Sequence, residues 1–149
     1  MKSGIRHVGI VVQDIEQSIN FWRDHFDFCI FLDQIEEGKF IEHLLNMPEV
    51  KVRTVKMKGQ DNSLIELLYF YEKQDIDLWR GNFTSTGLTH LALNIINLNE
   101  KVNNLQSKGF KLINTPRKSE NGSVLVAFIE GPEGILLELV ESVNKIDKI

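Results

Sequence analysis

Two histidines and two glutamates stand in matching surroundings in the two halves of this 149-residue sequence. His7 and His90 each open a short β-rich run, HVGIVV in the first half and HLALNI in the second. Glu66 and Glu138 each interrupt an apolar run, LIELL and LLELV. Imidazole nitrogens and carboxylate oxygens together suit divalent transition metals. These four residues are therefore the candidate metal ligands.

The two glutamates are predicted to point into protein, because alternate residues on both faces of each run are apolar. Burying an ionised carboxylate without a partner is costly, and a divalent cation would neutralise both. The mixed N/O donor set suits Zn, Ni, Co, Mn or Fe better than Ca or Cu(I). Two alternatives stay open at this point. Each glutamate can pair with a Lys or Arg, or the four groups can line a metal-free cleft that binds a ligand.

Local patterns predict the elements that carry these residues. Asp14 and Gln17 form a helix-capping signature before an apolar stripe at positions 15, 19, 22 and 26. In the second half, Asn97 or Asn99 can cap a stripe at positions 98, 102 and 105, and Gly109 ends that helix. A strand is expected after each helix, from about residues 28 and 110, and a hairpin then closes each half.

The two halves therefore repeat the same order of elements, which predicts an α+β fold built from two βαβββ modules. We assign the modules to residues 5–74 and 87–142, with a linker at 75–86, inside one domain of residues 1–149. The first module carries extra length at residues 36–49, where a short helix is expected. This insertion either borders the site or packs on the sheet.

Composition excludes several classes of protein. The net charge is −4 and the 17 Lys and Arg residues are spread along the chain, so nucleic acid is not an expected partner. The sequence has no apolar run long enough to span a membrane. One cysteine allows no intrachain disulfide, and the first residues do not resemble a secretory signal. We therefore expect a cytoplasmic protein.

The sequence resembles the vicinal oxygen chelate superfamily, which includes glyoxalase I, methylmalonyl-CoA epimerase, extradiol dioxygenases, and fosfomycin and bleomycin resistance proteins. The resemblance runs from about residue 5 to residue 141. It rests on HVGIVV…DIEQSINFW, LIELL, GLTHLAL and FIEGPEGILLELVE. It implies that paired modules form a cupped, barrel-like mixed sheet around one divalent metal, and that the chain is a homodimer. The metal ligands of the family fall on His7, Glu66, His90 and Glu138.

The resemblance implies a metal-dependent lyase or isomerase of glyoxalase I type, acting on an α-hydroxycarbonyl or acyl compound by proton transfer through an enediolate. Glu138 would be the proton-transferring carboxylate, with Glu66 as the symmetric choice. Three alternatives remain: an epimerase like methylmalonyl-CoA epimerase, a non-haem iron extradiol dioxygenase and a non-catalytic binding or resistance protein. The dioxygenases typically use two His and one Glu, which would leave out Glu66. Bleomycin-binding members generally lack the metal ligands.

Two substitutions separate the chain from particular members of that family. Bacterial glyoxalase I holds glutathione with an Arg and an Asn at the positions of Val11 and Phe70. Glutathione is therefore not the expected co-substrate. The epimerase carries an acidic base on its third strand, where this sequence has Thr54 and Lys56.

Overall fold

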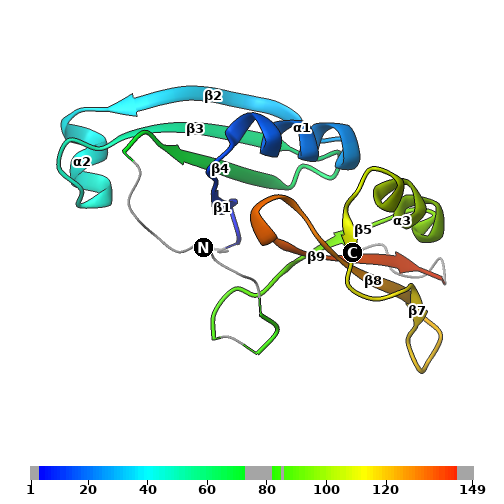
Figure 1. Ribbon diagram of the computed structural model, residues 1–149. Coiled ribbons are helices and arrows are strands. Elements are labelled where there is room, and N and C mark those ends of the chain that lie inside the picture. Colours follow the sequence, from blue (N-terminus) through cyan, green and yellow to red (C-terminus); the bar gives the residue numbers. More distant parts are fainter. Residues whose placement is uncertain (1–3, 73–81, 85, 144–149) are drawn as a thin grey trace. The chain divides into compact units, whose positions relative to one another are not determined.

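The computed structural model describes residues 4–72, 82–84 and 86–143 (Figure 1). The chain divides into two compact units, Met1–Asp77 and Leu78–Ile149, and each is described by itself. Residues 75–81 and 85 of the predicted linker lie outside the described residues, so the assignment of modules and linker stays a prediction. Within the described residues, no helix is long and apolar enough to cross a membrane.

The first unit has the order β-α-β-β-β, with one short helix inserted. Its elements are β1 (Val8–Val11), α1 (Ile15–Phe26), β2 (Cys29–Glu37), α2 (Lys39–Leu45), β3 (Lys51–Lys58) and β4 (Leu64–Phe70). The strands form a sheet in the order β1-β4-β3-β2. β1 pairs with β4 in parallel, and the other two pairs are antiparallel. The sequence-predicted insertion is therefore helical, as α2.

The second unit repeats this plan. Its elements are β5 (Leu91–Asn94), α3 (Leu98–Ser107), β6 (Lys111–Leu112), β7 (Arg117–Lys118), β8 (Val124–Glu130), a 3₁₀ turn (Pro132–Gly134) and β9 (Leu136–Ser142). The sheet order is β5-β9-β8-β6, β7 also pairs with β8, and β5 runs parallel to β9. The predicted α+β fold with a repeated βαβββ plan is confirmed. The described strands form two open mixed sheets, and neither closes into a barrel.

Each unit buries one face of its sheet under a helix. α1 contacts β4 in the first unit, and α3 contacts β8 and β9 in the second (Figure 1). The buried apolar residues of the first interface are Ile15, Ile19, Phe21, Trp22, Val55, Met57, Ile65 and Leu67. Those of the second are Leu98, Val102, Leu105, Ala127, Ile129, Leu137 and Leu139. The apolar stripes read from the sequence are thus the faces that form the cores.

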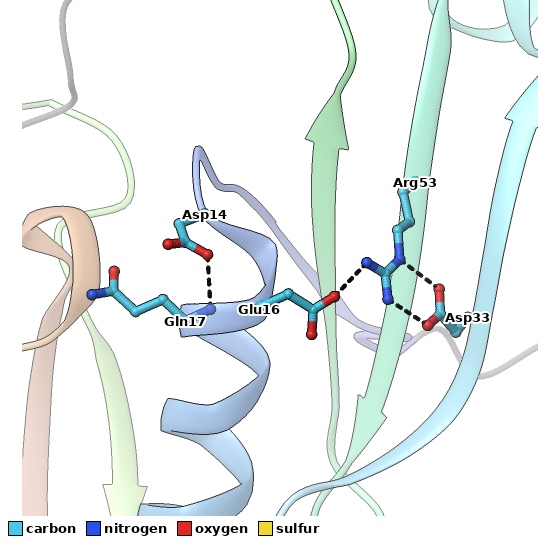
Figure 2. A network of polar contacts seen from close by, with 5 residues as sticks. All are labelled: Asp14, Glu16, Gln17, Asp33 and Arg53. Carbon is cyan, nitrogen blue, oxygen red and sulfur yellow. Dashed lines mark hydrogen bonds and ion pairs between the residues drawn. The ribbon is translucent and has the colours of Figure 1, made fainter.

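The two long helices begin in different ways. Asp14 caps α1 as predicted, because its Oδ1 accepts a hydrogen bond of 2.9 Å from the backbone N–H of Gln17 (Figure 2). Asn97 is the N-cap residue of α3, but its side chain makes no capping hydrogen bond. Glu141 of β9 caps this helix instead, accepting from the backbone N–H of Asn97 at 3.3 Å and of Leu98 at 2.9 Å. A carboxylate there also opposes the positive end of the helix dipole.

A charged network ties α1 to two strands of the first sheet (Figure 2). Arg53 of β3 donates to both oxygens of Asp33 of β2, at 2.9 and 2.8 Å. Its remaining nitrogen donates to Glu16 of α1 at 2.6 Å. These hydrogen bonds hold the pKa of Asp33 below its ordinary value of 3.8, against the opposing effect of partial burial.

This network predicts a pH-dependent contribution to stability. Because the pKa of Asp33 is lower in the folded protein, its stabilisation is complete above the ordinary value of 3.8 and disappears as the pH falls through the folded pKa. Asp33→Asn should lower the free energy of unfolding by about 1 kcal/mol at pH 7. Urea denaturation at pH 7 and at pH 2–3 measures the difference. Arg53→Lys keeps the charge but not the bidentate contact, so it should lose part of the same stabilisation free energy. An Asp33→Asn effect that is equal at both pH values would contradict this account.

The cap of α3 gives a second prediction. Glu141→Ala should reduce the free energy of unfolding by about 1 kcal/mol, because two helix N–H groups lose their acceptor. Asn97→Gly is the matched control: glycine accepts the positive φ of 58° at this position, and the replaced side chain caps nothing. Thermal unfolding of the two variants decides the point. A larger loss for Asn97→Gly than for Glu141→Ala would show that Asn97 is the effective cap.

Candidate functional site

The first predicted pair is assembled by the parallel pairing of β1 and β4. Gly9 lies opposite Glu66 in this register, and His7 precedes Gly9 by two residues, so its side chain lies on the same face. The Nε2 atom of His7 lies 3.1 Å from Oε2 of Glu66. Gly9 carries no side chain between them. The structure therefore brings together two predicted residues that are 59 positions apart in the sequence.

The second unit builds the same pair from the same parts. β5 is parallel to β9, and Ala92 lies opposite Glu138, with His90 two residues earlier. The Nε2 atom of His90 lies 3.3 Å from Oε2 of Glu138. A small residue faces the glutamate in both units. The sequence repeat thus corresponds to a repeated arrangement of side chains as well as of strands.

The glutamates are less buried than the sequence indicated. α1 and α3 cover the opposite face of each sheet, and the glutamate face is covered in part, since Val52, Thr54 and Leu136 on that face are buried. In β4, Ile65 and Leu67 are buried under α1, whereas Leu64 and Leu68 on the glutamate face are half-exposed. The side chains of Glu66 and Glu138 are 14% and 25% exposed. Both carboxylates are therefore partly desolvated yet open to a ligand.

The geometry of each pair fits two neighbouring ligands of one small cation. Ligands at about 2.0–2.2 Å from a tetrahedral or octahedral metal lie roughly 2.9–3.5 Å from each other. The observed N···O distances of 3.1 and 3.3 Å fall within this interval. Within the described residues, no group of three or more His, Cys, Asp or Glu side chains is placed to hold a metal. The meeting of the two pairs on one cation therefore stays a prediction.

The second ring nitrogens of the two histidines differ in their surroundings. The Nδ1 atom of His90 lies 2.9 Å from the hydroxyl oxygen of Thr89, which can orient the ring with Nε2 toward Glu138. Metal-bound histidines generally have such an outer partner. The Nδ1 atom of His7 is buried, and the described residues give it no hydrogen-bond partner. The second pair is therefore the better oriented of the two.

The residues that face the glutamates from the next strand were not among the predicted site residues, although the sequence left open a Lys or Arg partner for each glutamate. Lys56 of β3 lies opposite Glu66, and its Nζ is 3.2 Å from Oε1 of that glutamate. The matching residue in the second unit is Phe128 of β8, opposite Glu138. Its ring packs edge-on against the His90 ring, with centroids 5.3 Å apart. The signal was present, since counting back from each hairpin turn gives the register.

The inserted helix α2 packs on the sheet and also borders a cavity. Ile41 of α2 is buried with Val50 and Val52, against the half-buried side chains of Leu68 and Phe70. Beside this cluster is a cavity of about 370 Å³, lined by Asn46, Met47, Pro48, Val50, Lys51, Phe70 and Glu72. Phe70 lies four residues along β4 from Glu66, on the same face. The packing role of the insertion is therefore confirmed, and its place at the border of the site stays a prediction.

Comparisons with known proteins agree with this fold. Residues 4–139 match the model of the Glyoxalase/Bleomycin resistance protein/Dioxygenase superfamily. The chain is 30% identical to a probable lactoylglutathione lyase of Synechocystis, over 95% of this chain and 97% of that protein. It is 26% identical to a mitochondrial methylmalonyl-CoA epimerase of Dictyostelium discoideum, over 92% and 77%. A glyoxalase family protein from Bacillus cereus superimposes with a TM-score of 0.86 at 25% identity, covering 94% of each chain. The chain belongs to the glyoxalase/bleomycin resistance protein/dioxygenase superfamily.

Proposed function

We propose that this chain is a metal-dependent lyase or isomerase of glyoxalase type, acting on a small oxygenated substrate. The observation that carries the proposal is the pair of His–Glu contacts at ligand spacing, 3.1 Å in one unit and 3.3 Å in the other. The relatives support it, because they include both a lactoylglutathione lyase and an epimerase by name. Both names fit chemistry in which a proton moves at a carbon beside a carbonyl group.

His7, Glu66, His90 and Glu138 would together hold one divalent cation. Two carboxylates balance its charge and two neutral imidazoles complete a donor set that suits Zn, Ni, Co, Mn or Fe. When bound, such a cation supplies Lewis acidity to two neighbouring oxygens of a substrate. The carboxylates, which are part of the chain itself, supply the proton transfer.

Glu138 is the better candidate for the proton shuttle. Glu66 is held through both carboxylate oxygens, Oε2 by His7 and Oε1 by Lys56. Glu138 is paired through Oε2 with His90, and the described residues place no second cation on it. Its Oε1 is therefore the oxygen that would accept a proton from the substrate carbon and return it. Glu66 would serve in binding rather than in proton transfer.

The substrate is proposed to be smaller than a glutathione adduct. Val11 is exposed at the end of β1 and Phe70 packs near Ile41, so neither position offers the Arg or Asn that the resemblance associates with glutathione. A small α-hydroxycarbonyl or acyl compound needs no such contacts. An epimerase reaction uses the same proton transfer and remains the nearest alternative.

Lys56 favours one further candidate function. If its ion pair with Glu66 persisted when a cation was bound, His7, His90 and Glu138 would remain as ligands. Two His and one carboxylate form the donor set of non-haem iron oxygenases. Oxygen uptake with a catechol after anaerobic Fe(II) loading distinguishes this dioxygenase activity from proton transfer.

The homodimer and the cytoplasmic location stay predictions.

The metal proposal predicts a specific loss of cation affinity. Mn²⁺ binding, followed by isothermal titration calorimetry, should weaken by at least about 100-fold in His7→Ala and in Glu138→Ala, because a ligand atom is lost. His43→Ala is the matched control, since His43 is exposed on α2 and is not one of the four candidate ligands. Equal Mn²⁺ affinity in His7→Ala and the unsubstituted protein would refute the four-residue site.

The proton-transfer proposal predicts that the protein exchanges carbon-bound hydrogens of a substrate with solvent, and that this exchange depends on Glu138. The Mn²⁺-loaded protein should exchange the carbon-bound hydrogens of hydroxyacetone with D₂O, as measured by proton NMR. Glu138→Gln should slow this exchange by about 10²- to 10⁴-fold, because the amide cannot accept the proton. Mn²⁺ binding measured on the same variant separates loss of the base from loss of the metal. Unchanged exchange in a metal-loaded Glu138→Gln protein would show that Glu138 is not the proton-transferring carboxylate.

A further inference from the structure

The two halves of the repeat differ at the position that faces the glutamate. In the first unit Lys56 lies opposite Glu66, and in the second Phe128 lies opposite Glu138. The parallel pairing that places each histidine beside its glutamate is the same in both units. One half of the repeated site therefore carries a cation where the other carries an aromatic ring.

The positive charge of Lys56 is left without full compensation if Glu66 binds a cation. Its side chain is 22% exposed, and its ion-pair partner among the described residues is Glu66, at 3.2 Å. A divalent cation on Glu66 would place a second positive charge beside the Lys56 ammonium with one carboxylate between them. Charges that are this close and partly desolvated repel each other strongly. A second negative group beside Lys56 would relieve that repulsion.

A second carboxylate on this face, Glu36 of β2, is already engaged by the hydroxyl of Thr54. On β3, the hydroxyl of Thr54 is two residues away on the same face, is buried, and donates to Glu36 at 2.5 Å. On β2, the residue opposite Lys56 is the apolar Leu32. The next cation along this face is Lys58, which is exposed and lies opposite Leu64. Among the described residues, the ion pair with Glu66 is therefore the contact that balances the charge of Lys56.

We propose that Lys56 recognises a negatively charged group of the substrate, such as a carboxylate, next to the oxygens that bind the cation. This inference rests on the proposed metal-dependent function and narrows its substrate class to anionic hydroxy or oxo compounds. This role makes cation binding and anion binding cooperative. The cation shares the negative charge of Glu66, and the anion then compensates the positive charge of Lys56. In the absence of an anion, Lys56 weakens cation binding at Glu66.

The experiment measures Mn²⁺ affinity by the electron paramagnetic resonance signal of free Mn²⁺, with no addition, with glycolate, and with hydroxyacetone. Glycolate offers two neighbouring oxygens and a negative charge, whereas hydroxyacetone offers two neighbouring oxygens without the charge. In the unsubstituted protein, glycolate should tighten Mn²⁺ binding by about tenfold and hydroxyacetone should change it much less. Titrations without protein correct for Mn²⁺ that binds glycolate in solution.

Lys56→Met should bind Mn²⁺ about tenfold more tightly without an anion and should lose most of the glycolate effect. Lys56→Arg should retain that effect, and Lys58→Met should behave as the unsubstituted protein, because it removes a charge from the same face away from Glu66. An equal glycolate effect in Lys56→Met and the unsubstituted protein would overturn the inference. So would tighter Mn²⁺ binding in Lys56→Met with the glycolate effect intact, since Lys56 would then only repel the cation.

This result is separable from failure of the proposed function. If His7→Ala and Glu138→Ala leave Mn²⁺ binding unchanged, the metal site itself is wrong, whatever Lys56 does. If those variants lose Mn²⁺ binding while Lys56→Met leaves the glycolate effect intact, the metal site stands and the role of Lys56 is refuted.

Discussion

The parallel pairing of the first and last strands of each unit is the constraint on which the site depends. Parallel neighbours need a long connection, and here that connection is the helix and the hairpin between β1 and β4, or between β5 and β9. A slip of one residue would turn Glu66 or Glu138 toward the helix. The register is held by the buried residues on the opposite face, such as Leu67 and Leu137. The apolar core therefore fixes the position of the polar groups.

The two faces of each sheet divide stability from chemistry. The helix-covered face carries the buried apolar side chains and gains the free energy of their burial. The glutamate face is only partly covered, so its carboxylates keep contact with solvent. The partly desolvated carboxylate of Glu66 is stabilised there because His7 contacts one of its oxygens and Lys56 the other. Such a face tolerates charged groups that a fully covered sheet would exclude.

The sequence predicted what depends on local pattern or on the repeat. The helices, the Asp14 cap and the His–Glu pairs follow from periodicity, capping chemistry and duplication. It failed where the partner is distant: Glu141 replaces the side chain of Asn97 as the cap of α3, across 44 residues. It also overestimated the burial of the glutamates, because an apolar residue on a strand need not be covered by another layer. Contacts of this kind depend on tertiary packing.

Duplication places equivalent residues in both halves, so a difference at one position gives the two glutamates different surroundings. Glu66 must give up a contact before either of its oxygens can accept a proton, because both are paired. Glu138 keeps one oxygen outside its pair with His90, and it lies opposite Phe128 rather than a cation. In the proposed function, proton transfer would therefore fall to Glu138, and the anion would be attracted to the side of Lys56. If that proposal holds, the difference between Lys56 and Phe128 would assign binding to one glutamate and proton transfer to the other.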